Sequence, residues 1–213
     1  MEDEMKRLLS ALWTPLFPVF VFLLCQLAGV GVVYANCSLS ISLFLVEILV
    51  IVWLLAGKKV KREDFHIDSS WRSRQFVVAL LGAFSIMFAM NVVAELMGLP
   101  DDAMKTVIEV VKSPLGVLSI ALLGPIAEEM CFRGAIIGGM LREGRDPWTA
   151  ILVSSLLFGL IHFNPAQIPF AVVMGAVLGI IYVRTESLLL PIFVHVFNNS
   201  TAVVQLFLMG DAA

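Results

Sequence analysis

Residues 114–141 read PLGVLSIALLGPIAEEMCFRGAIIGGML, an apolar run with two acids and an arginine inside it. About 20 apolar residues in a helix cross the hydrocarbon core of a bilayer, so this stretch predicts a membrane-spanning helix. An ionisable side chain at that depth is costly unless it is paired or hydrated, and such residues mark functional sites in membrane proteins. The stretch therefore indicates both the fold class and the place where the function lies.

The composition of the whole chain also favours a lipid bilayer as its surroundings. Of its 213 residues, 60% are hydrophobic and 15% are charged, and the mean hydropathy is +0.96. Ordinary soluble domains contain about 25% charged residues. The net charge of -3 and the scattered basic residues exclude a nucleic-acid binder, which needs a concentrated basic face. The cysteines, Cys25, Cys37 and Cys131, are odd in number and predict no disulfide framework.

Further apolar runs predict an all-α, polytopic transmembrane helical bundle of about seven spans in the cell membrane. The predicted spans are 16–34, 39–56, 76–97, 114–141, 148–163, 168–183 and 187–209. The connection after the second span is basic, with Lys58, Lys59, Lys61, Arg62, Arg72 and Arg74. The positive-inside rule places this connection in the cytoplasm, and alternation then places the C-terminus outside. Charged and apolar residues mix in segment 101–112, which predicts a short interfacial helix, with a structural lid as the alternative.

Costly polar residues gather in three of the predicted spans. They are Glu128, Glu129 and Arg133 in the fourth, His162 in the fifth, and His195 and Asn199 in the seventh. We expect them to form one polar cluster between helices. Elsewhere the ionisable residues within spans are Glu47, interpreted as paired or interfacial, and Glu95, expected to reach water.

Helical spacing gives these residues possible partners. Glu129 and Arg133 are four residues apart, so they share a helix face and can form an ion pair. His195 and Asn199 share a face in the same way. Glu128 is rotated by about 100° from Glu129, so the two acids can serve different purposes.

Such a cluster has the parts of a hydrolase. An arginine favours the ionised form of a neighbouring carboxylate. A carboxylate beside a histidine can hold a water molecule and take its proton, which is the general-base step of peptide hydrolysis. A histidine and an asparagine can both donate hydrogen bonds to a developing oxyanion, each contributing about 3–4 kcal/mol in a preorganised site.

The pattern resembles the CPBP family of intramembrane proteases, which includes the CAAX proteases and the Abi group. The family motifs E-E-x-x-x-R, F-x-x-x-H and H-x-x-x-N are met by Glu128, Glu129 and Arg133, by Phe158 and His162, and by His195 and Asn199. The resemblance covers roughly residues 76–209. It predicts a protease core at residues 76–213, preceded at 1–75 by a pair of transmembrane helices and the basic cytoplasmic loop.

The resemblance implies a glutamic endopeptidase that cleaves a membrane-associated or lipid-modified protein or peptide within the lipid bilayer. Glu128 would be the general base, His162 would help it orient the attacking water, and His195 and Asn199 would stabilise the oxyanion. No cofactor is implied, and the zinc motif H-E-x-x-H is absent from the sequence. If the enzyme were metal-dependent, the ligands would be Glu128, His162 and His195.

Several alternatives stay open at this point. Glu128, Glu129 and Arg133 could be a buried ion-pair network that fixes helix packing. His162 could cap its helix, and His195 with Asn199 could join helices by hydrogen bonds. At the level of function, the alternatives are a non-catalytic membrane protein for immunity or regulation, and a proton or cation carrier.

Overall fold

The computed structural model describes residues 2–34, 37–66, 73–97 and 103–210, and within these ranges it contains helices and no strand. Before the central span the elements are α1 (Glu2–Tyr34), α2 (Leu39–Ala56), the 3-10 turn η1 (Arg62–Phe65), α3 (Ser73–Met97) and α4 (Ala103–Val111). The central span is a continuous rod of α5 (Pro114–Leu118), η2 (Ser119–Leu123), α6 (Gly124–Glu129), η3 (Met130–Ile137) and α7 (Gly138–Arg142). Helices α8 (Pro147–Leu160), α9 (Gln167–Thr185) and α10 (Leu189–Gly210) follow. The all-α prediction is confirmed.

The seven predicted spans correspond to α1, α2, α3, the rod, α8, α9 and α10. Five of these, α1, α2, the rod, α9 and α10, are long and apolar enough to cross a membrane. Helix α8 is apolar but has only 14 residues. Helix α3 has 25 residues, a length that suffices for a span. The chain is therefore a multi-pass helical membrane protein, consistent with a count of about seven spans.

The rod differs from the single regular α-helix that the sequence spacing assumed. Its η2 and η3 segments are π-helical, with wider turns than an α-helix. Pro125 has no N–H to donate, and its ring would clash with the carbonyl one turn earlier. The chain relieves this at η2, where the Gly124 N–H bonds back to the Ser119 carbonyl, five residues before it. Single-turn π segments of this kind are frequent at functional sites.

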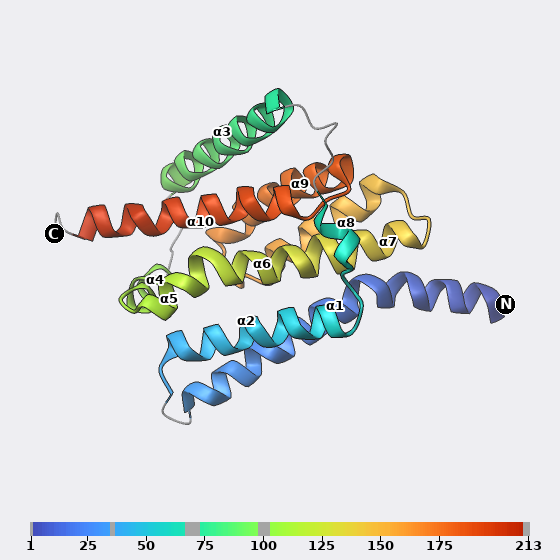
Figure 1. Cartoon of the computed structure of the whole chain (residues 1–213), viewed down its shortest axis with the longest axis horizontal. Helices are drawn as coiled ribbons and strands as arrows, with labels where there is room; N and C mark the ends of the chain where they lie inside the picture. The colour runs from blue at the N-terminus through green and yellow to red at the C-terminus, as the bar shows by residue number, and fades with distance from the viewer. Residues whose placement is uncertain (1, 35–36, 67–72, 98–102, 211–213) are drawn as a thin grey trace.

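The rod lies at the centre of the bundle. In Figure 1 it runs beside α10, with α1 and α2 to one side and α3 to the other. One core cluster joins side chains of α1 and α2, such as Phe22 and Val50, to Phe132 and Ile136 of the rod. Helix α8 is tied to the rod by the buried Ser154 hydroxyl, which donates to the Phe132 carbonyl at 3.0 Å. The first two helices therefore support the rod directly.

Helix α4 occupies most of segment 101–112, for which the sequence predicted a short helix. It packs closely on the start of the rod. A Cβ on Gly116 would lie 1.8 Å from the Val110 carbonyl oxygen, so only glycine allows this approach. The Ser40 hydroxyl of α2 donates to the same carbonyl at 3.2 Å. These contacts join α4 to both α2 and the rod.

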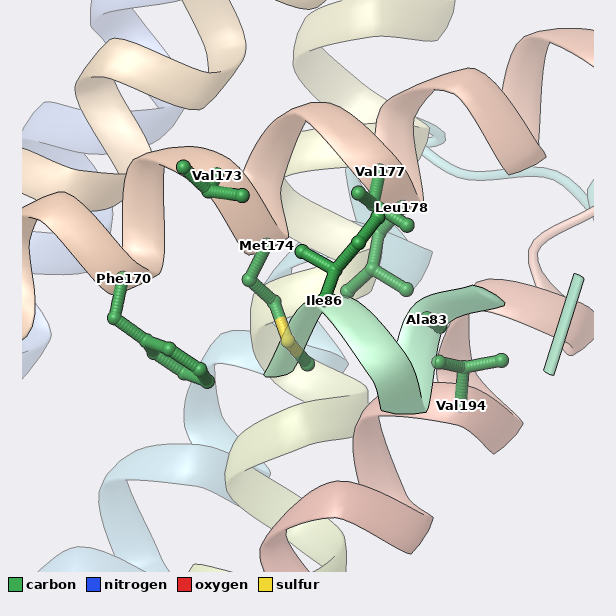
Figure 2. A pocket seen from close by; sticks show the side chains of 8 residues that line it. All are labelled: Ala83, Ile86, Phe170, Val173, Met174, Val177, Leu178 and Val194. Carbon is green, nitrogen blue, oxygen red and sulfur yellow. The ribbon is translucent and has the colours of Figure 1, made fainter. Parts of the chain in front are cut away.

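Helix α3 packs against α9 and α10, at the edge of the bundle (Figure 1). A cavity of about 10 Å³ lies at this contact, and Figure 2 shows the side chains that line it. It is lined by Ala83, Ile86, Phe170, Val173, Met174, Val177, Leu178 and Val194. An apolar space of this size lacks the polar partners that an ordered water needs, so it is a small packing gap in an otherwise apolar contact.

Candidate active site

The site residues of the rod and of α10 meet at His195, whose ring also contacts Phe158 of α8. Helix α10 places this side chain against the rod, where it is 5% exposed. Its Nδ1 donates a hydrogen bond to Glu129 Oε1 at 2.8 Å. Its Nε2 lies 3.7 Å from Glu128 Oε2. The adjacent acids therefore face the two nitrogens of one imidazole, although they differ in direction along the helix.

Glu129 and Arg133 form the tightest part of the cluster. Arg133 Nη1 donates to Glu129 Oε1 at 2.8 Å, and the two side chains are 1% and 0% exposed. Arg133 Nη2 donates to the Gly175 carbonyl at 3.1 Å, which ties α9 to the rod. A charge-assisted pair of this kind holds both side chains in one geometry. Removing either partner would leave the other charge buried and unpaired, which would destabilise the fold. The sequence-based expectation of an ion pair between these two residues matches the geometry.

Glu128 has a different environment from its neighbour. Its side chain is 22% exposed, whereas that of Glu129 is fully buried. The separation of 3.7 Å from His195 Nε2 is too long for a good hydrogen bond, so both atoms keep capacity for another partner. The pair thus divides into one acid that is held by protein groups and one that is accessible.

The Phe158 ring from α8 occupies the centre of the cluster. The Arg133 guanidinium lies over this ring at 4.7 Å from its centroid, in cation–π geometry. The rings of His162 and His195 meet it edge-on, with centroids at 5.1 and 5.9 Å. One aromatic side chain therefore separates and orients the two imidazoles. This gives the phenylalanine of the F-x-x-x-H pattern a physical purpose.

His162 lies in the turn after α8, not within the span as its spacing suggested. The helix ends at Leu160, ahead of Asn164 and Pro165, and the residue before a proline disfavours helical geometry. His162 Nδ1 donates to the Phe158 carbonyl at 2.8 Å and so caps the helix. The capping alternative is therefore present in the structure. Because a neutral ring that donates from Nδ1 leaves Nε2 as an acceptor, the same contact leaves one nitrogen for a water molecule.

Asn199 is held by the π turn of the rod. Its Nδ2 donates to the Ile120 carbonyl at 3.1 Å, and its Oδ1 accepts from Asn198 Nδ2 at 3.1 Å. Ile120 has this carbonyl free for a physical reason. The residue four positions on, Gly124, donates to Ser119 instead, and the residue five positions on, Pro125, has no N–H. The amide of Asn199 keeps its second N–H for another acceptor.

Several groups at the site were beyond sequence reasoning. The carbonyls of Ile120 and Gly175 carry no sequence signal, because every residue has a carbonyl and only the fold exposes one. Asn198 is next to Asn199 in sequence, and its side chain bonds to that of Asn199. Cys131, beside the acids in sequence, is fully buried, as expected for a packing residue.

Among the described residues, no three His, Cys, Asp or Glu side chains are arranged to hold a metal ion. The alternative set of Glu128, His162 and His195 therefore does not form a ligand cluster in this conformation. A groove of about 270 Å³ lies elsewhere, between α1 and the end of the rod, where Trp13, Lys59 and Arg142 are among its lining residues. No residue of the polar cluster lines it.

The fold and the cluster define a class: a multi-pass helical membrane protein that encloses a Glu, Arg, His and Asn site among its helices. Comparison with known proteins then shows which family this part of the chain resembles. Residues 110–201, which include every residue of the cluster, match the family described as type II CAAX prenyl endopeptidase Rce1-like. This part of the chain is therefore similar to a family of membrane peptidases.

Curated relatives are likewise named as proteases or peptidases. The membrane-embedded CAAX protease MroQ of Staphylococcus aureus (strain USA300) is 25% identical over 232 aligned residues, covering 96% of this chain and 93% of that protein. YdiL of Bacillus subtilis (strain 168), named as a membrane peptidase, is 28% identical, covering 60% of this chain and 54% of that protein. CAAX prenyl protease 2 of Arabidopsis thaliana is 28% identical, covering 42% and 35%. The chain thus spans about half of YdiL but nearly all of MroQ. No solved structure matches.

Proposed function

We propose that the chain is an intramembrane endopeptidase in which Glu128 activates the attacking water. The observation that supports this most directly is the difference between the two adjacent acids. Glu129 is fully buried and bonded to Arg133 and His195, whereas Glu128 is 22% exposed and keeps its capacity for a partner. A general base must reach a water molecule and the substrate, and only Glu128 of this pair is accessible.

The reaction follows from these positions. Glu128, with the free Nε2 of His162 as a second acceptor, holds a water molecule and takes one of its protons as the water oxygen attacks the peptide carbonyl carbon. The carbonyl oxygen becomes an oxyanion, which accepts hydrogen bonds from His195 Nε2–H and from the second N–H of Asn199. Glu128 then returns the proton to the leaving nitrogen as the carbon–nitrogen bond breaks. Atoms and charge balance without a cofactor.

The charges of the cluster support this assignment for His195. Its Nδ1–H already donates to Glu129, so only a ring that is protonated on both nitrogens also donates from Nε2. In that form two carboxylates face two cations, His195 and Arg133, and the buried cluster carries no net charge. Such compensation is what a site in low dielectric requires, because an excess charge there is costly.

The substrate class follows from the family and from the position of the site. We propose a peptide bond in a membrane-associated or lipid-modified protein or peptide, since the family description and two of the relatives' names refer to CAAX proteins or prenyl substrates. A lipid-anchored segment would reach a site that lies among membrane-spanning helices without crossing the bilayer. The cell membrane is the proposed location.

The test compares cells that produce the wild-type chain with cells that produce Glu128→Gln, using mass spectrometry of membrane proteins and peptides. We expect at least one membrane-associated substrate to change length only with the wild type. Glu109→Gln is the matched control, because Glu109 is an exposed acid on α4 that pairs with Lys112 at 2.6 Å. The proposal fails if Glu128→Gln processes the same peptides as wild type, an outcome that would favour a non-catalytic protein.

A further inference from the structure

Glu47 of α2 is a buried acid that the proposed reaction does not use. Its side chain points into the bundle and is 8% exposed, in a helix whose other residues are almost all apolar. Ser119, at the start of the π segment η2, is 0% exposed, and its backbone carbonyl lies beside Gly124 together with Glu47 Oε1. Yet Glu47 Oε2 and Ser119 Oγ both lack a hydrogen-bond partner among the residues that the structure describes. Two polar groups from different helices thus face each other with bonding capacity left over.

This polar pair lies directly against the helix that carries Glu128. A Cβ placed on Gly124 would come within 3.2 Å of both Glu47 Oε1 and the Ser119 carbonyl oxygen. The absence of a side chain at Gly124 therefore allows Glu47 to approach the backbone of α6. Gly124 and Glu128 are four residues apart, so they lie on one face of the helix, a single turn from each other.

Helix packing alone does not explain an acid at this position. A buried polar atom without a partner destabilises the fold, and a buried charged group does so more strongly. A leucine of similar size would fill the space between α2 and α6 without that cost, as Val46, Val50 and Leu54 do elsewhere on the helix. Costly polar groups inside membrane spans are usually functional. The unpartnered atoms of Glu47 and Ser119 are suited to binding a small polar molecule, and water is the one that fits such a site.

We propose that Glu47 and Ser119 bind a water molecule against the α6 turn that carries Glu128, and that this polar site sets the position of the Glu128 carboxyl. Glu47 is then a positioning residue that acts through hydrogen bonds. The inference rests on the proposed function, since it assigns Glu47 a purpose in the same site. Ser119 adds a second link, because its π segment also supplies the Ile120 carbonyl that holds Asn199.

The experiment measures kcat, KM and the thermal midpoint of the purified full chain, with the peptide found by the cellular comparison as substrate. For Glu47→Leu we expect kcat to fall about 10–100-fold, with KM within about twofold of wild type, because small misplacements of a catalytic group have effects of this size. The thermal midpoint should stay equal or rise, since an unpartnered polar group is removed. Glu47→Gln should keep kcat within about threefold, because an amide can also bind water.

Ser119→Ala should lower kcat less than Glu47→Leu. The double variant should be no slower than Glu47→Leu alone, because both changes remove the same site. Ser42→Ala is the control: it removes another buried hydroxyl of α2, which donates to the Gly29 carbonyl at 2.6 Å, and it should leave kcat unchanged. The inference is overturned if Glu47→Leu keeps wild-type kcat, if it loses kcat and thermal stability together, or if Glu47→Gln does not restore activity.

A structure of the wild type at water-resolving resolution provides a readout that needs no substrate. It should contain a water within about 3.2 Å of Glu47 Oε2 and Ser119 Oγ. If that structure shows no water between Glu47 Oε2 and Ser119 Oγ, the inference is also overturned. The proposed function has a separate test: if Glu128→Gln is inactive while Glu47→Leu is normal, only the positioning by Glu47 is wrong. If Glu128→Gln retains activity, the proposed function itself is wrong.

Discussion

The polar cluster has a closed side, formed by Glu129, Arg133 and Phe158, and an open side, formed by Glu128, His162 and Asn199. On the closed side the two charged groups are at most 1% exposed and bind each other and the neighbouring helices. On the open side each side chain retains an acceptor or donor that no protein group occupies, and Glu128 is 22% exposed. His195 contacts both acids and so joins the two sides.

The difference suggests how a hydrolytic site can exist inside an apolar bundle. The closed side pairs its charges with each other and holds the helices in place, whereas the open side leaves groups available to water and substrate. Changes on the open side should then reduce activity and preserve the fold. Changes on the closed side should reduce both.

The largest expected effect is on the open side. Glu128→Gln keeps the size of the side chain but removes the proposed base, so the rate of cleavage should fall by about 10²–10⁴-fold. The thermal midpoint should stay near that of wild type, because the Glu128 carboxyl makes no short hydrogen bond to His195. Cleavage rate and thermal unfolding, measured on one preparation, check this. A parallel loss of folding would contradict the separation into two sides.

On the closed side, Arg133→Met should destabilise the fold by about 3–5 kcal/mol, because it leaves the Glu129 carboxylate buried beside a single partner. Thermal unfolding in detergent measures the effect. The double variant Glu129→Gln with Arg133→Met should recover part of this loss, since neither charge then remains. A stable Arg133→Met single variant would show that the ion pair does not hold the bundle together.

Asn199→Ala tests a residue of the open side that also binds the rod, through the Ile120 carbonyl. If its free N–H stabilises the oxyanion, kcat should fall by about 10²–10³-fold. The Ile120 carbonyl would lose its partner, which adds a stability cost of about 1 kcal/mol. Steady-state kinetics and thermal unfolding separate the two effects. A change in KM with kcat unchanged would assign Asn199 to substrate binding instead.

The smallest expected effect comes from Phe158→Leu. This change removes the ring that contacts Arg133, His162 and His195 and retains an apolar side chain. The loss of cation–π and aromatic contacts should cost about 1 kcal/mol. For a chain of this size that corresponds to about 2–4 °C in the thermal midpoint. No shift at all would show that Phe158 merely fills space.

Much of this could be predicted from the sequence. Length and apolarity of the runs predicted the helices, because a bilayer requires long apolar segments whose backbone bonds are internal. The ion pair of Glu129 with Arg133 followed from spacing, since residues four apart on a helix are neighbours. The sequence also predicted that the candidate site is built from three separate segments, because polar groups in apolar surroundings are costly and mark functional positions.

The sequence was less informative where a backbone feature or a distant helix decides the geometry. The assumption of a regular helix at 114–141 missed the π segments, and with them the free Ile120 carbonyl that binds Asn199. His162 was placed within a span, whereas the turn before Pro165 holds it. Glu47 was noticed as an acid in a span but set aside, because nothing local shows that α2 lies against Gly124.

By itself, then, the sequence determined that this protein is a helical membrane protein with a polar site, since solvent preference and helical periodicity are local properties of the chain. Only the tertiary structure decided which acid is buried and which is accessible, because the two are adjacent in sequence and alike in chemistry. The difference arises from what the other helices bring to each carboxyl: Glu129 binds His195 and Arg133, whereas the Glu128 side chain remains 22% exposed.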